Sequence, residues 1–257
     1  MIKTTNNDLK RVLDYIGDDY AKCLYIYLDI KEYGLESENI KLWIQEKDNE
    51  IKCIVMKYYT GMHIYSKNTE FDKYEVIELI KKEEPKMISS MSNIADYVNY
   101  IPEGYLREDG FVMKVVPNQP SNPNASKASR EDIAEICHLL ENDIELGIPY
   151  GYDLLYKQLS ERFDSGYGRN WVIRENGEIV AHCATYADGY GVSVHGGLIV
   201  RDDHKGRGLG VEALRSLAND VIKDGKELIG YVYTPAAIKT HERAGREVVG
   251  KWTKIYI

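Results

Sequence analysis

Glycine occupies every second position of the segment 206–210, GRGLG, which directly follows the apolar run 198–200. Because glycine has no Cβ, alternate glycines let main-chain N–H groups converge closely on an anion. A helix that begins at once after the loop adds its own unpaired N–H groups and the positive end of its dipole. Lys205 and Arg207 add fixed positive charge beside the loop. The segment therefore predicts a pyrophosphate site.

The spacing excludes two common phosphate loops. A Walker loop closes with Gly-Lys-Ser/Thr, which this segment lacks. A dinucleotide fingerprint needs G-x-G-x-x-G and an acidic residue after the next strand, whereas here the spacing is G-x-G-x-G and Thr234 follows that strand. A glycine-rich turn without any ligand is the other interpretation that the loop alone leaves open.

The elements around this loop are read from hydrophobic periodicity. A Pro- and Asn-rich stretch, 117–125, indicates a linker. Ser129 and Asp132 resemble a capping box that opens a helix burying Ile133, Ile136, Leu140 and Ile144. A second helix should place Leu154, Leu155, Leu159 and Phe163 inward. The remaining predicted elements are an antiparallel meander (171–174, 179–186 and a strand ending at 197–200), a helix with Val211, Leu214, Leu217, Ala218, Val221 and Ile222 on its apolar side, a strand at 228–233, a helix at 235–244 and a strand at 247–257.

The N-terminal half gives weaker signals. Two strands are predicted at 41–47 and 51–60 around a turn, with helices at 71–82 and 92–100. Its glycines are too scattered to build a second phosphate loop. The predicted organisation is an α+β domain at 1–116, a linker at 117–127 and a second α+β domain with a mixed sheet at 128–257.

The loop and the order of elements in 128–257 resemble the GCN5-related N-acetyltransferases (GNAT). The first-ranked motif of that superfamily, Val-x-x-x-x-Arg/Gln-Gly-x-Gly-x-Gly/Ala, is matched from Val200 onward, with Lys205 at the Arg/Gln position. The resemblance implies a GNAT-like fold for this half, and for 1–116 a degenerate acetyltransferase-like domain. It also implies an acetyl-CoA cosubstrate, with the pantetheine arm lying along 198–200 as an added strand. The implied coenzyme contacts are Leu198, Ile199, Val200, Lys205, Gly206, Arg207, Gly208, Leu209, Gly210, Val211 and Thr234.

The catalytic groups depart from the family pattern. Where relatives carry a Tyr that protonates the leaving thiolate, the sequence has His241, our candidate general acid. Where some relatives carry a Glu base on the strand before the loop, it has Val194. The adjacent His195 is a weak candidate base, because strand alternation turns it to the opposite face unless a bulge intervenes. His182 lies on the neighbouring strand, and a structural or surface role explains either histidine better than catalysis does. Cys183 has no partnered histidine at a readable spacing, so no covalent intermediate is expected.

Composition limits the partners. The 257 residues carry a formal net charge of −8, which disfavours nucleic acid and anionic membranes and tolerates a cationic amine. Four separated cysteines predict reduced, buried thiols in a cytoplasmic protein, and no metal-ligand spacing is present. The polar N-terminus indicates no signal peptide, and no apolar run reaches the ~18 residues that cross a bilayer.

The predicted activity is transfer of an acetyl or short acyl group from acetyl-CoA to a primary amine of a small molecule, by direct attack in a ternary complex, in a monomer or homodimer. Two alternatives stay open: an acyl-CoA-binding regulatory sensor without turnover, which the missing Tyr and Glu favour, and a protein-lysine acetyltransferase. Tyr150, Tyr152 and Tyr167 are possible pocket residues, although packing or surface roles account for them as well.

Overall fold

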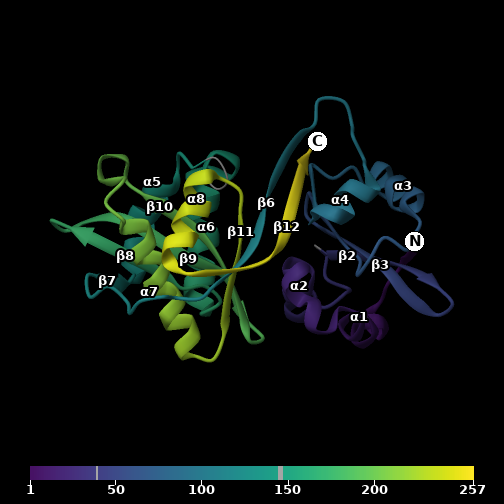
Figure 1. Ribbon diagram of the computed structural model, residues 1–257, viewed down its shortest axis with the longest axis horizontal. Helices are drawn as coiled ribbons and strands as arrows, with labels where there is room; N and C mark the ends of the chain where they lie inside the picture. Colours follow the sequence, from purple (N-terminus) through teal and green to yellow (C-terminus); the bar gives the residue numbers. More distant parts are fainter. Residues whose placement is uncertain (39, 144–146) are drawn as a thin grey trace. The chain divides into compact units, whose positions relative to one another are not determined.

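The computed structural model describes residues 1–38, 40–143 and 147–257 (Figure 1). The chain divides into two compact units: unit 1 is Met1–Val112 with Val249–Ile257, and unit 2 is Met113–Val248. This division differs from the expected 1–116, 117–127 and 128–257 in two places. The stretch 113–127 belongs to unit 2, which takes in the end of the expected first domain and the whole expected linker, and Ala125–Lys127 pairs there as a strand. The last nine residues belong to unit 1, because the end of the final strand pairs there.

Unit 1 carries two helices ahead of the predicted hairpin that the sequence pattern did not reveal. In chain order its elements are β1 (Ile2–Lys3), α1 (Leu9–Ile16), α2 (Leu24–Tyr33), β2 (Ile40–Lys47), β3 (Glu50–Tyr58), β4 (Gly61–Tyr65), α3 (Lys73–Glu83), β5 (Met87–Met91), α4 (Ser92–Val98) and β6 (Leu106–Val115), which continues into unit 2.

The predicted hairpin and both predicted helices of unit 1 are present. β2 and β3 pair antiparallel across a turn in which Asp48 and Asn49 adopt positive φ, as tight hairpin turns require. Within unit 1 the strands follow the order β1-β2-β3-β4-β5-β12, with β4 and β5 parallel. The strand β12 (Arg246–Tyr256) starts in unit 2 and ends in unit 1, where Trp252–Tyr256 pairs antiparallel with β5.

Unit 2 follows the element order expected for 128–257, with one extra strand in front. Its elements are β7 (Ala125–Lys127), α5 (Ile133–Leu140), α6 (Gly147–Ser165), β8 (Asn170–Glu175), β9 (Glu178–Gly189), β10 (Val192–Val200), α7 (Leu209–Lys223), β11 (Glu227–Val232), α8 (Pro235–Ala244) and the start of β12. The strands run in the order β11-β10-β9-β8-β7. The predicted meander β8-β9-β10 is antiparallel, and β10 and β11 are parallel.

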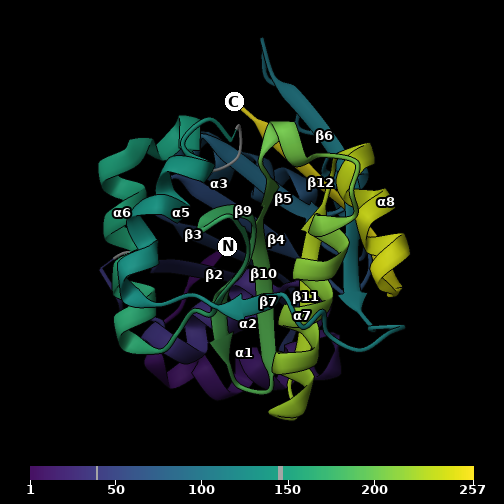
Figure 2. The ribbon, with the colours of Figure 1, turned by 90° about the vertical axis from the view of Figure 1, so that its left-hand side faces the viewer.

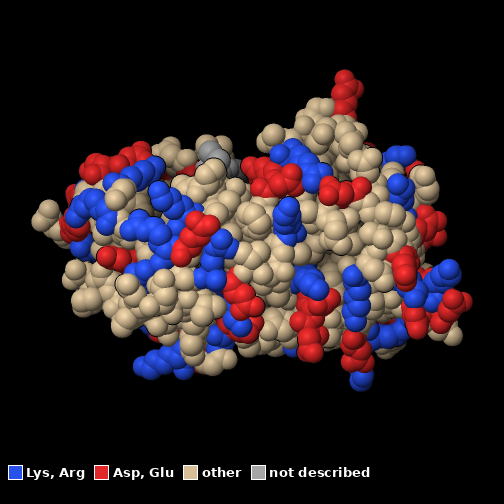
Figure 3. All heavy atoms as spheres, in the orientation of Figure 1, with Lys and Arg blue, Asp and Glu red and all other residues tan. Residues whose placement is uncertain are grey.

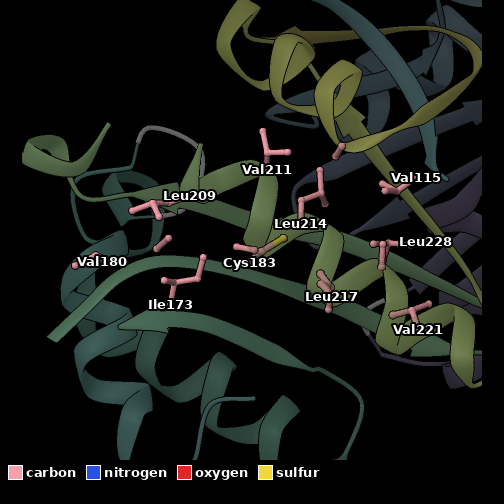
Figure 4. Packing of buried hydrophobic residues seen from close by; sticks show 14 residues of the cluster. Val115, Ile173, Val180, Cys183, Leu209, Val211, Leu214, Leu217, Val221 and Leu228 are labelled. Carbon is pink, nitrogen blue, oxygen red and sulfur yellow. The ribbon is translucent and has the colours of Figure 1, made fainter. Parts of the chain in front are cut away.

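Helices cover both faces of this sheet (Figure 2). Ile133, Ile136 and Leu140 of α5 pack with Leu155 and Leu159 of α6 on one face. On the other face α7 lays a continuous apolar side against the strands. Figure 4 shows these side chains meeting residues such as Ile173, Cys183 and Leu228. Burial of this α7 side holds the start of the helix, and with it the glycine loop, against the end of β10.

Most predicted inward positions of unit 2 are buried, Phe163 is partly buried, and two are exposed. The capping box of Ser129 and Asp132 is present ahead of α5. Leu154 is 45% exposed and Ile222 is 44% exposed, so both lie at the margin of their helices and outside the core. The sequence pattern therefore predicted an apolar stripe one residue too wide on α6 and on α7. Ile144 lies outside the described residues.

The two units repeat one design. Each runs strand, two helices, three antiparallel strands, helix, strand, helix and strand. The pairings repeat as well: β1 with β2 matches β7 with β8, and parallel β4 with β5 matches parallel β10 with β11. The loop between β4 and α3 in unit 1 is therefore the counterpart of the glycine loop between β10 and α7.

All four cysteines are buried and none forms a disulfide, as expected. Of the helices in the described ranges, none has both the length and the apolar character that crossing a bilayer requires.

Candidate active site

The glycine loop has the backbone conformation that only glycine adopts freely. Gly206 and Gly208 have φ of 80° and 86°, and Gly208 is the N-cap of α7. A Cβ on Gly206 would meet no atom within 4 Å, so the main chain there faces open space. Gly210 serves packing, because a Cβ on it would lie 3.3 Å from Cγ2 of Val200. The loop thus presents main-chain N–H groups at a helix start with no side chain in front of them.

The strand that leads into this loop parts from its neighbour. The parallel ladder of β10 with β11 joins 192–194 to 227–229, and in the described chain no register pair extends it. On its other edge β10 stays paired with β9 as far as Val200. From His195 onward, one edge of the β10 main chain is therefore available to an extended ligand.

Two irregularities mark the point of separation. The register of β10 against β9 shifts between Val194 and His195 and again between Gly196 and Ile199. A Cβ on Gly196 would overlap the ring of Tyr186 from β9, and a Cβ on Gly197 would overlap its hydroxyl oxygen. These glycines let the Tyr186 ring lie on the β10 backbone, and Arg162 of α6 stacks over its outer side, with the guanidinium carbon 5.1 Å from the ring centroid. Sequence reasoning missed all four residues, although the pair Gly196-Gly197 inside a strand is a recognisable bulge signal.

His182 stabilises this irregular part of β10 through a hydrogen bond to Gly197. Its Nδ1 lies 2.7 Å from the carbonyl oxygen of Gly197, and its Nε2 lies 3.0 Å from Oδ1 of Asn170. The oxygen and nitrogen of an Asn amide exchange places when the group turns by 180°, and a neutral His182 requires the orientation in which the Asn170 NH2 donates to Nε2. A carbonyl oxygen only accepts, so Nδ1 carries the proton and donates it to Gly197. Burial lowers the pKa of His182 to about 4, although the hydrogen bond to Gly197 opposes this shift. His182 is therefore a neutral structural residue, in agreement with the role expected from the sequence.

Acid should destabilise the protein through His182. Below the ordinary histidine pKa of ~6.5, His182 is protonated in the unfolded chain, whereas in the folded chain it is protonated only near pH 4. Unfolding free energy should then fall by about 2 kcal/mol between pH 6.5 and pH 5 on account of this residue. Urea unfolding at each pH measures it, and His182→Gln should remove that part of the slope. His63→Gln in unit 1 is the matched comparison, since burial also lowers the pKa of His63 to about 4.

The two candidate catalytic histidines meet. Nε2 of His195 lies 2.9 Å from Nε2 of His241, and the side chains are almost fully enclosed, with 7% and 1% exposed. His241 is held from α8, where its Nδ1 lies 2.8 Å from the carbonyl oxygen of Ala237. The His195 ring occupies the space above Gly230 of β11, where a Cβ would overlap it. The histidine pair therefore sits where β10 and β11 part.

Burial sets the protonation of this pair. It lowers the pKa of His195 well below the usual range, and the charge of neighbouring His241 adds to the effect. It also lowers the pKa of His241, which the hydrogen bond to Ala237 opposes and the charge of Arg246 reinforces. Both rings are accordingly neutral at pH 7. The register shift at His195 is the irregularity that had to be present for this residue to reach the site.

The other residues expected to contact the coenzyme have different places in the fold. Leu198, Ile199 and Val200 lie on the separated part of β10, and Leu209 and Val211 bury their side chains in the core beneath the loop. Thr234 caps α8, because its hydroxyl accepts the N–H of Ala237. Its side chain thus has a structural use in the fold.

The loop cations are partly neutralised by acids. Lys205 pairs with Asp202, and Arg207 makes a two-pronged ion pair with Glu175. A third cation, Arg243 of α8, was missed by sequence reasoning because α8 is distant in sequence. A Cβ on Gly208 would lie 3.6 Å from its Nη2, and within the described ranges no carboxylate pairs with it. Figure 3 shows Lys and Arg side chains gathered over this part of unit 2.

The counterpart loop of unit 1 has lost these features. Residues 66–72, SKNTEFD, contain no glycine. Asp72 caps α3 by accepting the N–H of Tyr74, so a carboxylate already occupies the place of an anion. Unit 2 alone carries the loop geometry that suits a pyrophosphate.

The tyrosines considered for an acceptor pocket lie elsewhere. Tyr152 stacks on His138 of α5, with ring centroids 4.6 Å apart. Tyr167 lies beside Gly189 at the end of β9, where a Cβ would be 3.5 Å from its ring. The side chain of Tyr150 falls outside the described part. Neither described contact reaches the histidine pair.

Comparisons with known proteins agree with this geometry. A family model described as the acetyltransferase (GNAT) family matches residues 134–245. No curated protein sequence matches the chain. Among solved structures, a GCN5-related N-acetyltransferase from Sphaerobacter thermophilus aligns with 99% of this chain and 93% of its own, at 17% identity and a TM-score of 0.66.

Two further structures cover the whole chain. A GNAT-family acetyltransferase from Colwellia psychrerythraea aligns over 100% of both chains, at 11% identity and a TM-score of 0.63. A tandem GNAT protein from the clavulanic acid biosynthesis pathway aligns over 100% of this chain and 97% of its own, at 11% identity and a TM-score of 0.60. At these identities the structures show a shared fold, and the family model locates the domain. The chain therefore contains a GNAT acetyltransferase domain at residues 134–245 and shares its mixed α+β fold with GNAT proteins.

Proposed function

We propose that unit 2 transfers an acetyl or short acyl group from acetyl-CoA to a primary amine of a small molecule, by direct attack in a ternary complex. The observation that carries this proposal is the separation of β10 from β11 just before a glycine loop at a helix start. An extended thioester arm fits the free strand edge, and a pyrophosphate fits the loop. The overall charge of −8 is compatible with a cationic acceptor.

Each part of the site has a defined task in this proposal. The main-chain N–H groups of 206–211 bind the pyrophosphate, and the Arg243 guanidinium adds charge beside Gly208. The backbone at the bulge of β10 offers an N–H donor to the oxyanion that develops during attack. Acetyl-CoA supplies the activated acyl group. The protein then has to position the amine and remove its proton.

The test combines binding with turnover. Calorimetry with acetyl-CoA measures the coenzyme site, and release of free CoA thiol measures transfer to a panel of small amines. A lysine-containing peptide in the same assay tests the protein-lysine alternative. Binding and amine-dependent thiol release support the proposal. Binding without thiol release on any amine identifies an acyl-CoA sensor, and no binding at all refutes the coenzyme assignment.

Arg243 gives a prediction for the phosphate end. Arg243→Gln should weaken CoA binding about tenfold, because the variant loses a charge-assisted contact to a phosphate. S-acetyl-pantetheine lacks the phosphates, so its affinity should not change. The control is Arg246→Gln, since that guanidinium is already paired with Glu242. Equal losses for both donors would show that Arg243 acts only on the fold.

A further inference from the structure

The histidine pair contains a buried nitrogen whose lone pair has no hydrogen-bond partner among the described residues. His241 Nδ1 faces the carbonyl oxygen of Ala237, which only accepts, so that nitrogen carries the proton. The neutral ring then has an unprotonated Nε2. The single proton between the two Nε2 atoms must come from His195, whose own Nδ1 is left unprotonated.

No group in the described part of the chain hydrogen-bonds to Nδ1 of His195. Leaving a buried acceptor without a partner costs about 1–3 kcal/mol, so a fold keeps one where the site uses it. The atom belongs to the first residue after the β10–β11 ladder ends, beside the bulge that offers the oxyanion donor. If the coenzyme arm lies along β10, the amine nitrogen of the substrate must meet the thioester at this point of the strand.

We propose that Nδ1 of His195 is the general base of the reaction and that His241 is a positioning residue, which holds His195 in the tautomer with a free Nδ1. This inference rests on the proposed function and assigns His241 a different task from the acid role expected from the sequence. The chain Ala237 C=O···H–Nδ1 His241 Nε2···H–Nε2 His195 fixes the lone pair in place.

Atoms and electrons balance in this step. The amine lone pair forms the new C–N bond at the thioester carbonyl, the C–S bond breaks, and CoA leaves as the thiolate. The proton lost by nitrogen goes to His195 Nδ1. It then passes to the thiolate or to water, so the products are the amide and free CoA thiol. Because burial keeps the His195 ring neutral, the base form is present at pH 7 without prior deprotonation.

The first test reads the tautomers directly and needs no substrate. Long-range ¹H–¹⁵N correlation spectra of histidine-labelled protein should show His195 protonated at Nε2 and unprotonated at Nδ1, with His241 reversed. His241→Gln keeps an acceptor for the His195 proton and should preserve this pattern. His241→Leu removes the acceptor and should mix the two forms. A protonated Nδ1 on His195 in the wild-type protein overturns the proposal.

The second test is kinetic. His195→Gln keeps a group near the Nε2 position for His241 and removes the base, so kcat for amine-dependent thiol release should fall about 100-fold or more with the KM for acetyl-CoA nearly unchanged. His241→Gln should stay within about threefold of wild type, and His241→Leu should lose about tenfold. His138→Gln, an exposed histidine of the same unit, is the unchanged control.

The outcomes separate this inference from the proposed function. Acetyl-CoA binding and turnover with an unaffected His195→Gln would overturn the base assignment alone. Acetyl-CoA binding without turnover on any amine would overturn it too, because the pair would then have no reaction to serve. Failure to bind any coenzyme A species would refute the coenzyme site itself, a result visible by calorimetry before any variant is made.

Discussion

Gly208→Asp is expected to reduce coenzyme A affinity by more than 100-fold. Gly208 has φ of 86° at the start of α7, and Nη2 of Arg243 would lie 3.6 Å from the new Cβ. The added carboxylate would repel the pyrophosphate and would itself take up both the helix N–H groups and Arg243. Calorimetry with acetyl-CoA measures the loss.

The control is Gly225→Asp, at the other end of α7. Gly225 has φ of 72° and a Cβ there meets no atom within 4 Å, so this variant carries the same charge and a comparable backbone strain of about 1 kcal/mol. Its thermal unfolding should resemble that of Gly208→Asp, while its coenzyme affinity should equal the wild type. If Gly208→Asp binds acetyl-CoA like its parent, the loop does not hold the phosphates.

Gly230→Ala is expected to displace the His195 ring and destabilise unit 2 by about 3 kcal/mol, because overpacking a well-filled site forces neighbouring groups to move. Loss of the His195–His241 hydrogen bond should follow, and amine-dependent thiol release should drop by about two orders of magnitude. Urea unfolding and steady-state kinetics on the same preparation measure the two effects.

A double variant isolates the cause. In a His195→Ala background the space above Gly230 is free, so adding Gly230→Ala should cost less than about 1 kcal/mol. Such strong coupling is expected only between groups in direct contact. Equal costs of Gly230→Ala in the two backgrounds would mean that the glycine serves the β11 backbone and that His195 does not occupy this space.

The glycine loop and its geometry could be predicted because the signal is local. Packing alone rarely requires glycine at every second position between an apolar strand and an amphipathic helix. The helix expected at about 235–244 from its proline and its closing glycine is likewise present as α8 (Pro235–Ala244). The histidine pair could not be predicted in the same way. His195 and His241 are 46 residues apart, and their approach coincides with a register shift of β10 against β9 between Val194 and His195.

Helix α2 was not predicted, because its sequence pattern is typical of a strand. Its buried residues, Leu24, Ile26, Leu28 and Ile30, recur at every second position, a period typical of strands. The segment is nevertheless helical. Ile26 and Ile30 pack in the core of unit 1, and Leu24 and Leu28 are buried as well, so burial on more than one side of the helix hides the single apolar stripe. The repeat relationship between the two units was expected only from the family resemblance, which implied a degenerate acetyltransferase-like domain at 1–116. It is carried by element order and pairing and not by shared motifs.

The path of β12 decides how the chain can be divided. A fragment cut at the Pro-rich stretch, 1–116, would lack the strand that pairs with β5, and Trp252 and Ile255 would no longer fill its core. The main-chain N–H and C=O groups of Met87–Met91 would be unpaired at a sheet edge and could pair with strands of other molecules, so such a fragment should aggregate. A peptide of the last nine residues should restore its solubility by occupying that edge. Residues 249–257 are thus a structural component of the amino-terminal half, and deletions or substitutions within them act on the half that lies first in the chain.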